Sequence, residues 1–233
     1  PMEWKDPKSG DISSGYKEKG YFSEAFINML AFLGWNPGSS KEIYSLSELI
    51  NDFSIERVGK SGAKFDPEKT KWFNQQHLRT KPSSELAEVM KNSSDFSFSK
   101  GYFEKVADLM KERAVFMHDL LSEDYFFECP QGFDEKTFRK KWKKNSGELM
   151  SELFQLIEND ETFSSQSLEK IFKNFIDSKA IGMGAVLPCL RLILTGKGMG
   201  PSVFAIASLL GKKEVMERFN SKNKFFENLY KAK

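Results

Sequence analysis

The stretch from Ala180 to Phe219 constrains the fold of this chain more than any other. It holds two apolar runs of helical length, joined by the glycine-rich hinge Leu194–Pro201. Proline is tolerated in the first turn of a helix, so Gly200-Pro201 predicts that the second helix begins there. Gly211 stands where a helix would need a left-handed stop. We therefore expect a buried two-helix core, with Arg191 as a charged residue inside the otherwise apolar first run.

Helical signals recur along the rest of the chain. Ser45-Leu46-Ser47-Glu48 forms a capping box, and Asp66-Pro67 is typical of a helix start. Apolar residues at helical spacing predict a long helix from Tyr102 to about Leu121, and Asn145-Ser146-Gly147 is expected to break a later one. No segment shows sustained alternation of β-branched and polar residues. The predicted fold class is all-α, built from successive helical subdomains with a candidate boundary at Lys81-Pro82.

Composition excludes several classes of protein. A formal net charge of +2 argues against a chain-wide nucleic-acid surface but leaves room for a local basic face. Two cysteines, Cys129 and Cys189, without repeated spacing favour a reducing compartment and no disulfide framework. The apolar runs are too short to cross a bilayer, and the polar N-terminus is unlike a signal peptide. We expect a cytoplasmic monomer without membrane contact.

Motifs for catalysis or cofactors fail on their spacing. Val58-Gly59-Lys60-Ser61 lacks the upstream glycine and strand of a phosphate-binding loop. The glycines of Gly196–Gly200 do not match a dinucleotide fingerprint and predict a flexible turn. His77 and His118 show no metal-ligand spacing with each other or with the cysteines, so we expect no metal site. A nucleophile formed by Cys129 or Cys189 with a histidine is left open.

The basic run Lys136–Lys144 has two interpretations. Basic residues interleaved with aromatic ones suit phosphate contact and base stacking. Alternatively, the run is a solvated helix face whose Phe138 and Trp142 point into the core. Under the first interpretation the phosphate ligands are Lys140, Lys141, Lys143 and Lys144.

Three stretches together carry a family resemblance. They are GYKEKGYFSEAFINMLAFLGW (15–35), GAKFDPEKTKWFNQQHLR (62–79) and LRLILTGKGMGPSVFAIASLLGKKEVMERF (190–219). In their order and spacing they resemble the C-terminal portion of class I glutamyl-tRNA synthetases of bacterial type. The ATP-binding signatures of that family, a His-Ile-Gly-His-like motif and a Lys-Met-Ser-Lys-Ser-like loop, do not occur in this sequence.

The resemblance implies an architecture and a partner. It implies a stem-contact domain over residues 1–82 and an anticodon-binding domain in two helical parts, 83–158 and 159–233. The partner is glutamate tRNA. The parent enzyme ligates glutamate to that tRNA with ATP and Mg, whereas this portion is expected to hold no cofactor, no catalytic residues and no activity of its own.

The resemblance also assigns residues to the anticodon. Arg113 matches an arginine that reads the third base, and Arg191 matches one beside the first base. Pro201 and Val203 match positions that pack on splayed bases, a usual route for recognising unstacked RNA. Some relatives carry threonine at Gly200, so that base contact must be lost, made by backbone or replaced by Ser202. Two alternatives remain: Arg191 is a helix-terminal cation or salt-bridge partner, and the whole chain is a protein-interaction module.

Overall fold

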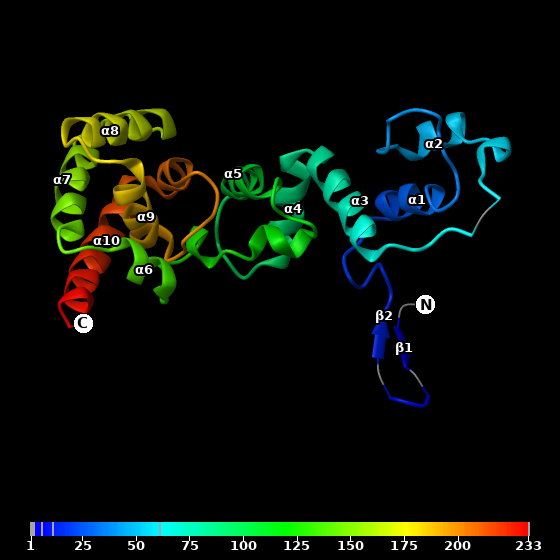
Figure 1. Ribbon diagram of the computed structural model, residues 1–233, viewed down its shortest axis with the longest axis horizontal. Helices are drawn as coiled ribbons and strands as arrows, with labels where there is room; N and C mark the ends of the chain where they lie inside the picture. The colour runs from blue at the N-terminus through cyan, green and yellow to red at the C-terminus, as the bar shows by residue number, and fades with distance from the viewer. Residues whose placement is uncertain (1–2, 6, 11, 61, 233) are drawn as a thin grey trace. The chain divides into compact units, whose positions relative to one another are not determined.

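A computed structural model describes residues 3–5, 7–10, 12–60 and 62–232. Within these ranges the regular secondary structure is helical apart from one short antiparallel hairpin, which confirms the all-α class (Figure 1). The chain divides into two compact units, unit 1 (Pro1–Ser122) and unit 2 (Glu123–Lys233). The finer division at residues 82 and 158 stays a prediction.

Unit 1 begins with the hairpin, in which Trp4 pairs with Ser13. Its helices then follow in chain order, with α1 packed on α2 and α3, and α4 packed on α5. The elements of unit 1 are β1 (Glu3–Lys5), β2 (Ile12–Ser14), α1 (Ser23–Ala31), α2 (Leu46–Asp52), η1 (Ile55–Arg57), α3 (Pro67–Thr80), α4 (Ser83–Ser93), α5 (Lys100–Met110) and η2 (Met117–Leu121).

The helix starts of unit 1 follow their predicted chemistry. The Ser45 hydroxyl accepts from the Glu48 N–H and the Glu48 carboxylate accepts from the Ser45 N–H, which closes the predicted capping box. The Asp66 carboxylate accepts two N–H groups at the start of α3, and Pro67 occupies its first turn. Both predictions are confirmed.

A buried amide ties α1 to α3 and to the loop before α2. Asn28 is fully buried; its Oδ1 accepts from the Tyr44 N–H at 2.8 Å and its Nδ2 donates to the Glu42 carbonyl at 3.0 Å. The His77 Nε2 lies 3.1 Å from the same Oδ1. Burial lowers the pKa of His77, so the ring is favoured in its neutral form and Nε2–H donates to Asn28.

The predicted long helix from Tyr102 to about Leu121 is wrong. Helix α5 ends at Met110, and the N–H groups of Arg113 and Ala114 both turn back to the Met110 carbonyl. The Asp119 carboxylate accepts from the Val115 and Phe116 N–H groups at 2.8 and 2.9 Å, replacing the helical partners of these groups. Such local side-chain bonds compete with a helix and are not visible in hydrophobic periodicity.

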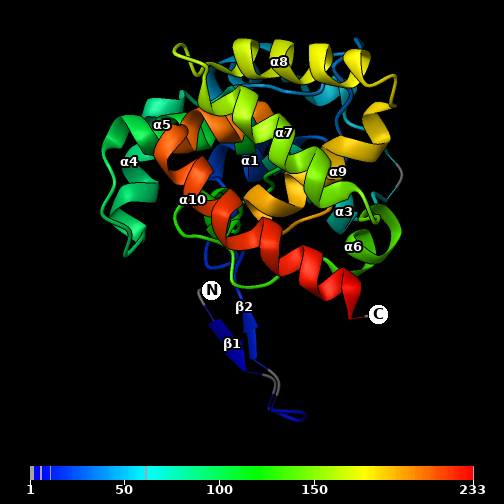
Figure 2. The ribbon, with the colours of Figure 1, turned by 90° about the vertical axis from the view of Figure 1, so that its left-hand side faces the viewer.

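Unit 2 is a helical bundle in which α10 packs on α7, α8 and α9 (Figure 2). Gly211 has φ +82° and kinks α10, and the chain resumes as a helix directly after it. The predicted helix stop at a residue with positive φ is thus confirmed, although with ψ 159° the backbone is extended there and a second helical segment follows at once. The elements are η3 (Asp124–Phe126), α6 (Glu135–Lys141), α7 (Ser146–Glu158), α8 (Ser165–Ser178), α9 (Met183–Thr195) and α10 (Val203–Lys231).

The core of unit 2 is rich in aromatic rings. Phe138 and Trp142 are each 1% exposed and pack against Phe226 of α10, with ring centroids 5.3 and 5.0 Å away. Helix α6 ends at Lys141 and α7 begins at Ser146, so the predicted break before the next helix is confirmed, with Gly147 in the first turn of α7. A Cβ at Gly147 would lie 1.9 Å from the Glu227 Oε1, so glycine lets α10 approach α7 closely.

Candidate nucleic-acid interface

The turn between α9 and α10 is anchored at its first residues. Helix α9 ends at Thr195, whose hydroxyl donates to the Arg191 carbonyl at 2.8 Å and accepts from the Lys197 N–H at 3.1 Å. Gly196 follows in the left-handed region with φ +67°, and its carbonyl accepts from the Asp134 N–H at 2.7 Å. The turn is thereby joined to the start of α6.

The glycines of this turn are close-packed. A Cβ at Gly196 would lie 2.4 Å from the Gly132 carbonyl oxygen, and one at Gly198 would lie 2.2 Å from the Thr137 Oγ1. Real Cβ atoms do not approach other atoms so closely, so both positions require glycine for contact with the α6 segment. Glycine at these two positions thus permits close packing, and the flexibility of the turn stays a prediction.

Gly200 brings two polar side chains together. A Cβ at Gly200 would lie 3.1 Å from the Arg191 Nη1 and 3.3 Å from the Tyr125 hydroxyl. The Arg191 side chain projects from the apolar helix α9, and its guanidinium thus lies at the turn beside a tyrosine from η3. Next to this group, Met199 is 85% exposed, which is the largest exposure among the large hydrophobic side chains described. Sequence reasoning assigned no role to Tyr125 or Met199.

Pro201 and Val203 lie on the inner side of the turn. Both are buried, with Val203 only 1% exposed, whereas Ser202 between them is exposed and its hydroxyl accepts from the Ala205 N–H. The structure therefore brings Arg191, Gly200, Pro201 and Val203 together in one turn. Lys197, Met199 and Ser202 are exposed at this turn, and Arg191 is half-buried.

One buried arginine connects this turn to the segment after η3. Arg218 of α10 is 1% exposed; its Nη1 donates to the Leu194 carbonyl at 2.6 Å and to the Tyr125 carbonyl at 2.8 Å. Its Nη2 donates to the Glu128 carbonyl at 2.9 Å, and its Nε donates to the Glu214 carboxylate at 2.7 Å. Sequence reasoning missed Arg218, because its spacing from Glu214 is also typical of an exposed ion pair.

The structure bears out one part of the second interpretation of the basic run Lys136–Lys144: its aromatic side chains point into the core. Phe138 and Trp142 are in the core, so base stacking on either ring is excluded in this structure. The side chains of Lys140, Lys143 and Lys144 are exposed. Exposed lysines on this face remain suited to phosphate contact.

Lys141 differs from its three neighbours. It is only half-exposed, and its Nζ lies 3.5 Å from the Gly184 carbonyl of α9. Pro188, four residues further along α9, has no N–H to offer that carbonyl. Lys141 thus compensates for a proline inside α9, a role the basic run did not predict.

Arg113 belongs to unit 1, whereas the other candidate residues belong to unit 2. It is exposed on the turn that ends α5, where its own N–H donates to the Met110 carbonyl at 2.8 Å. The turn presents the guanidinium at the surface of unit 1. The structure describes this residue and the Arg191 group in two separate units.

Comparison with known proteins places this geometry in a family. Residues 78–222 match the family model described as an anticodon binding domain, which covers more than half of the chain. The chain belongs to the anticodon binding domain family. Residues 8–72 match a second family model, the catalytic domain of class I tRNA synthetases for E and Q. The resemblance to the C-terminal portion of glutamyl-tRNA synthetases is thereby confirmed.

Individual relatives of the anticodon binding domain family agree with this assignment. The glutamate–tRNA ligase of Christiangramia forsetii is 45% identical over 94% of this chain and 44% of its own length. That of Porphyromonas gingivalis strain W83 is 40% identical over the same shares. A crystal structure of a glutamate–tRNA ligase from Elizabethkingia meningosepticum, in complex with its amino acid, superposes with a TM-score of 0.87 at 37% identity, covering 97% of this chain and 46% of that one. The chain spans about half the length of these relatives.

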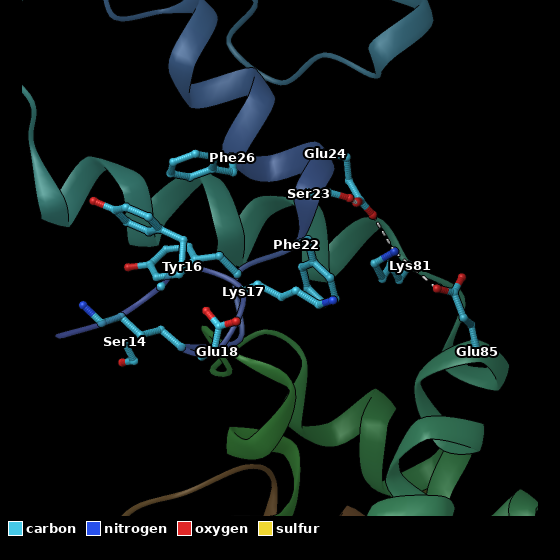
Figure 3. Close-up of a pocket in the computed structure, with 13 residues that line it drawn as sticks. Ser14, Tyr16, Lys17, Glu18, Phe22, Ser23, Glu24, Phe26, Lys81 and Glu85 are labelled. Carbon is cyan, nitrogen blue, oxygen red and sulfur yellow. Dashed lines mark hydrogen bonds and ion pairs between the residues drawn. The ribbon is translucent and has the colours of Figure 1, made fainter. Parts of the chain in front are cut away.

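A cavity of about 1060 Å³ lies in unit 1, largely in the segment that matches the catalytic-domain model (Figure 3). Its lining has three lysines, Lys17, Lys19 and Lys81, and three glutamates, Glu18, Glu24 and Glu85. Lys81 lies between Glu24 and Glu85, at 2.8 and 3.2 Å (Figure 3). Burial raises the pKa of Glu24, but hydrogen bonds from Lys81, its own backbone and Ser23 outweigh this and hold it at about 2. The balanced charges give the cavity no general attraction for phosphate.

The cysteines and histidines of the described residues form no pair within either unit. Both cysteines belong to unit 2 and both histidines to unit 1, so neither unit contains a cysteine–histidine pair. Burial raises the pKa of the Cys189 thiol, which favours its unreactive form. In the described ranges, no group of three or more His, Cys, Asp or Glu is arranged to hold a metal ion. No helix in the described part of the chain is long and apolar enough to span a membrane.

Proposed function

We propose that this chain binds glutamate tRNA and that its unit 2 turn contacts the bases of the anticodon loop. One observation carries the proposal. Within the anticodon binding domain match, the Arg191 guanidinium meets Gly200 beside the exposed Met199 side chain. A planar guanidinium can hydrogen-bond a base edge or stack on it, and a thioether is a soft, adaptable apolar contact.

The roles within the turn divide by exposure. Arg191, Met199 and Ser202 offer side chains to RNA, with the Ser202 hydroxyl standing in for the threonine that Gly200 lacks. Pro201 and Val203 are buried and shape the backbone, so their contact with bases runs through the turn itself. Such close backbone approach suits unstacked loop bases.

We propose two further contacts with the same RNA. Arg113, exposed on unit 1, reads the third anticodon base through its guanidinium fork. Lys140 near the end of α6 and Lys143 and Lys144 just after it contact phosphates, and Lys141 supports this segment through its contact with α9. Phosphate contacts orient the RNA without reading its sequence.

The relatives are about twice as long as this chain, so a catalytic role is proposed only for a longer protein that contains it. The relatives are named glutamate–tRNA ligases, and we infer that this chain supplies the tRNA-binding part of the same reaction. ATP and Mg would then be bound outside residues 1–233, since neither ATP signature occurs in them. We further propose a monomer that works in the cytoplasm.

A binding titration tests this function. Fluorescently labelled glutamate tRNA is titrated with the chain at about 50, 100 and 200 mM salt. Affinity that depends on phosphate contacts changes strongly over this range. We expect binding that weakens steeply with salt and that falls when the anticodon is exchanged. Absence of binding at the lowest salt would refute the proposal, and a stable complex with a protein instead would favour an interaction module.

Two variants separate base reading from charge. Arg191→Ala and Arg113→Ala should each lose about 1–3 kcal/mol on the cognate anticodon and far less on an exchanged one. Lys173→Ala is the control: it removes one positive charge from unit 2 at an exposed pair with Glu169 on α8. Equal losses on both anticodons would show that the arginine concerned does not read bases.

A further inference from the structure

The two side chains that flank Gly200 come from segments that are far apart in the sequence. Arg191 projects from the last turns of α9, and Tyr125 belongs to η3, more than sixty residues earlier in the sequence. Each approaches the Cβ position of Gly200 to within about 3.3 Å at most. An arrangement this close requires that the two backbones be fixed relative to each other within unit 2.

The buried guanidinium of Arg218 supplies that connection. A single nitrogen, Nη1, donates both to the Leu194 carbonyl at the end of α9 and to the Tyr125 carbonyl. Nη2 extends the contact to the Glu128 carbonyl, where the chain leaves η3. These carbonyls lie 24, 93 and 90 residues from Arg218 in the sequence, so no local element aligns them.

The charge and shape of arginine suit this position. Its planar fork directs several N–H donors from one rigid plane, whereas lysine offers one compact charge on a flexible stem. Here the fork meets three backbone carbonyls, while Glu214 balances the charge at Nε. A neutral or shorter side chain would leave carbonyls in a buried site without donors.

We propose that Arg218 is the positioning residue of the anticodon-reading turn: by holding the Leu194 and Tyr125 carbonyls it sets the distance between the Arg191 guanidinium, the Tyr125 hydroxyl and Gly200. The inference rests on the proposed binding of tRNA. Arg218 is only 1% exposed and contacts no RNA itself. It acts on base discrimination through the two side chains that flank Gly200.

General stabilisation of unit 2 is the competing explanation, and it predicts different data. A residue that only stabilises the fold changes the fraction of folded protein, and the folded molecules then discriminate anticodons as before. A positioning residue changes the ratio of affinities for cognate and exchanged anticodons in protein that is fully folded. It also loosens the turn and the η3 segment while leaving the rest of unit 2 protected.

The test uses Arg218→Lys, with Arg218→Met as the stronger variant. The matched control is Arg139→Lys, an exposed arginine on α6 whose Nη2 bonds the Glu135 carboxylate at 2.7 Å. Folding is checked by circular dichroism. Affinity is measured for glutamate tRNA and for the same tRNA with an exchanged anticodon, and amide hydrogen exchange compares residues 124–128 and 195–203 with α7 and α8.

We expect Arg218→Lys to lose discrimination about tenfold, the scale of one specific base contact, with the salt dependence unchanged and faster exchange confined to 124–128 and 195–203. Arg139→Lys should keep the wild-type ratio. An unchanged ratio in folded Arg218→Lys would overturn the inference while leaving tRNA binding intact. Loss of protection throughout unit 2 in both Arg218 variants would also overturn it, in favour of general stabilisation. If the wild-type chain does not bind the tRNA, the proposed function fails and this inference with it.

Discussion

Replacing Gly198 by alanine should measure how tightly the turn is held. Gly198 does not need an unusual φ, so alanine there carries no backbone penalty of the left-handed kind. Its Cβ would instead lie 2.2 Å from the Thr137 Oγ1 and 2.5 Å from the Asp134 Oδ2. Both side chains belong to the cap of α6: the Asp134 Oδ1 accepts from the Thr137 N–H at 3.0 Å, and the Oδ2 accepts from the Thr137 hydroxyl at 2.8 Å.

The magnitude follows from what must move. Overpacking one methyl into a filled site costs about 1–3 kcal/mol. Displacing Asp134 from its capping position costs about 1 kcal/mol more. We therefore expect Gly198→Ala to lower the free energy of unfolding of unit 2 by about 2–4 kcal/mol, by the sum of these terms.

A double-mutant cycle with Thr137→Ala isolates the clash. Thr137→Ala removes the hydroxyl that the added methyl of Gly198→Ala would contact and frees the Asp134 carboxylate to rotate, so by itself it should cost about 1 kcal/mol. The two changes together should then cost less than their sum by at least about 1 kcal/mol. Unfolding is followed in urea by circular dichroism, and amide exchange of residues 134–142 locates the change in unit 2.

Gly101→Ala is the control for the glycine-to-alanine change itself. Gly101 lies in the first turns of α5 with nothing within 4 Å of its Cβ position, so alanine should be neutral or stabilising by about 0.5 kcal/mol. The reasoning is refuted if Gly198→Ala behaves like Gly101→Ala. It is also refuted if the cycle with Thr137→Ala is additive, because the clash would then not be the cause.

Unit 1 offers three further predictions. Asn28→Ala should destabilise unit 1 by about 2–4 kcal/mol in urea unfolding, because the Tyr44 N–H and the Glu42 carbonyl lose a buried partner. His77 has a lowered pKa, so its stabilising contribution is complete above its ordinary value of 6.5 and is lost as the pH falls below it; His77→Gln should flatten this part of the stability profile, and an unchanged profile would contradict it. The Glu24 carboxyl, with a pKa of about 2, contributes fully above its ordinary 4.5 and loses its effect toward pH 2. Because the pair with Lys81 is partly exposed, Glu24→Gln should cost under about 1 kcal/mol at pH 7 and nothing near pH 2.

The structure also changes what the basic run on α6 signifies. Lysines and aromatic residues alternate there, a pattern that suits RNA binding, yet Phe138 and Trp142 serve the core while Lys140, Lys143 and Lys144 remain outside. The segment from Lys136 to Lys144 therefore supplies aromatic side chains to the core and exposed lysines to the surface. Lys141 has a third role, because it meets the carbonyl that Pro188 leaves without its helical donor.

Local signals in the sequence were sufficient for most helices and for the family. The capping box at Ser45 and the start at Asp66 depend on neighbours within three residues, and both formed as expected. Where a competing local bond intervened, as Asp119 does after α5, periodicity alone extended the helix too far. The motifs of the family are contiguous stretches, so they could be recognised without a fold.

Tertiary structure alone decided the character of the turn between α9 and α10. Its glycines suggest flexibility in the sequence. Their role depends on which atoms pack against them, and those atoms belong to Gly132 and Thr137 on another segment. The same holds for Arg218, whose carbonyl partners are up to 93 residues away. Hydrophobic spacing and caps record contacts within a few residues and thus determine the helices; the packing of the turn depends on contacts between distant segments, which only the folded chain brings together.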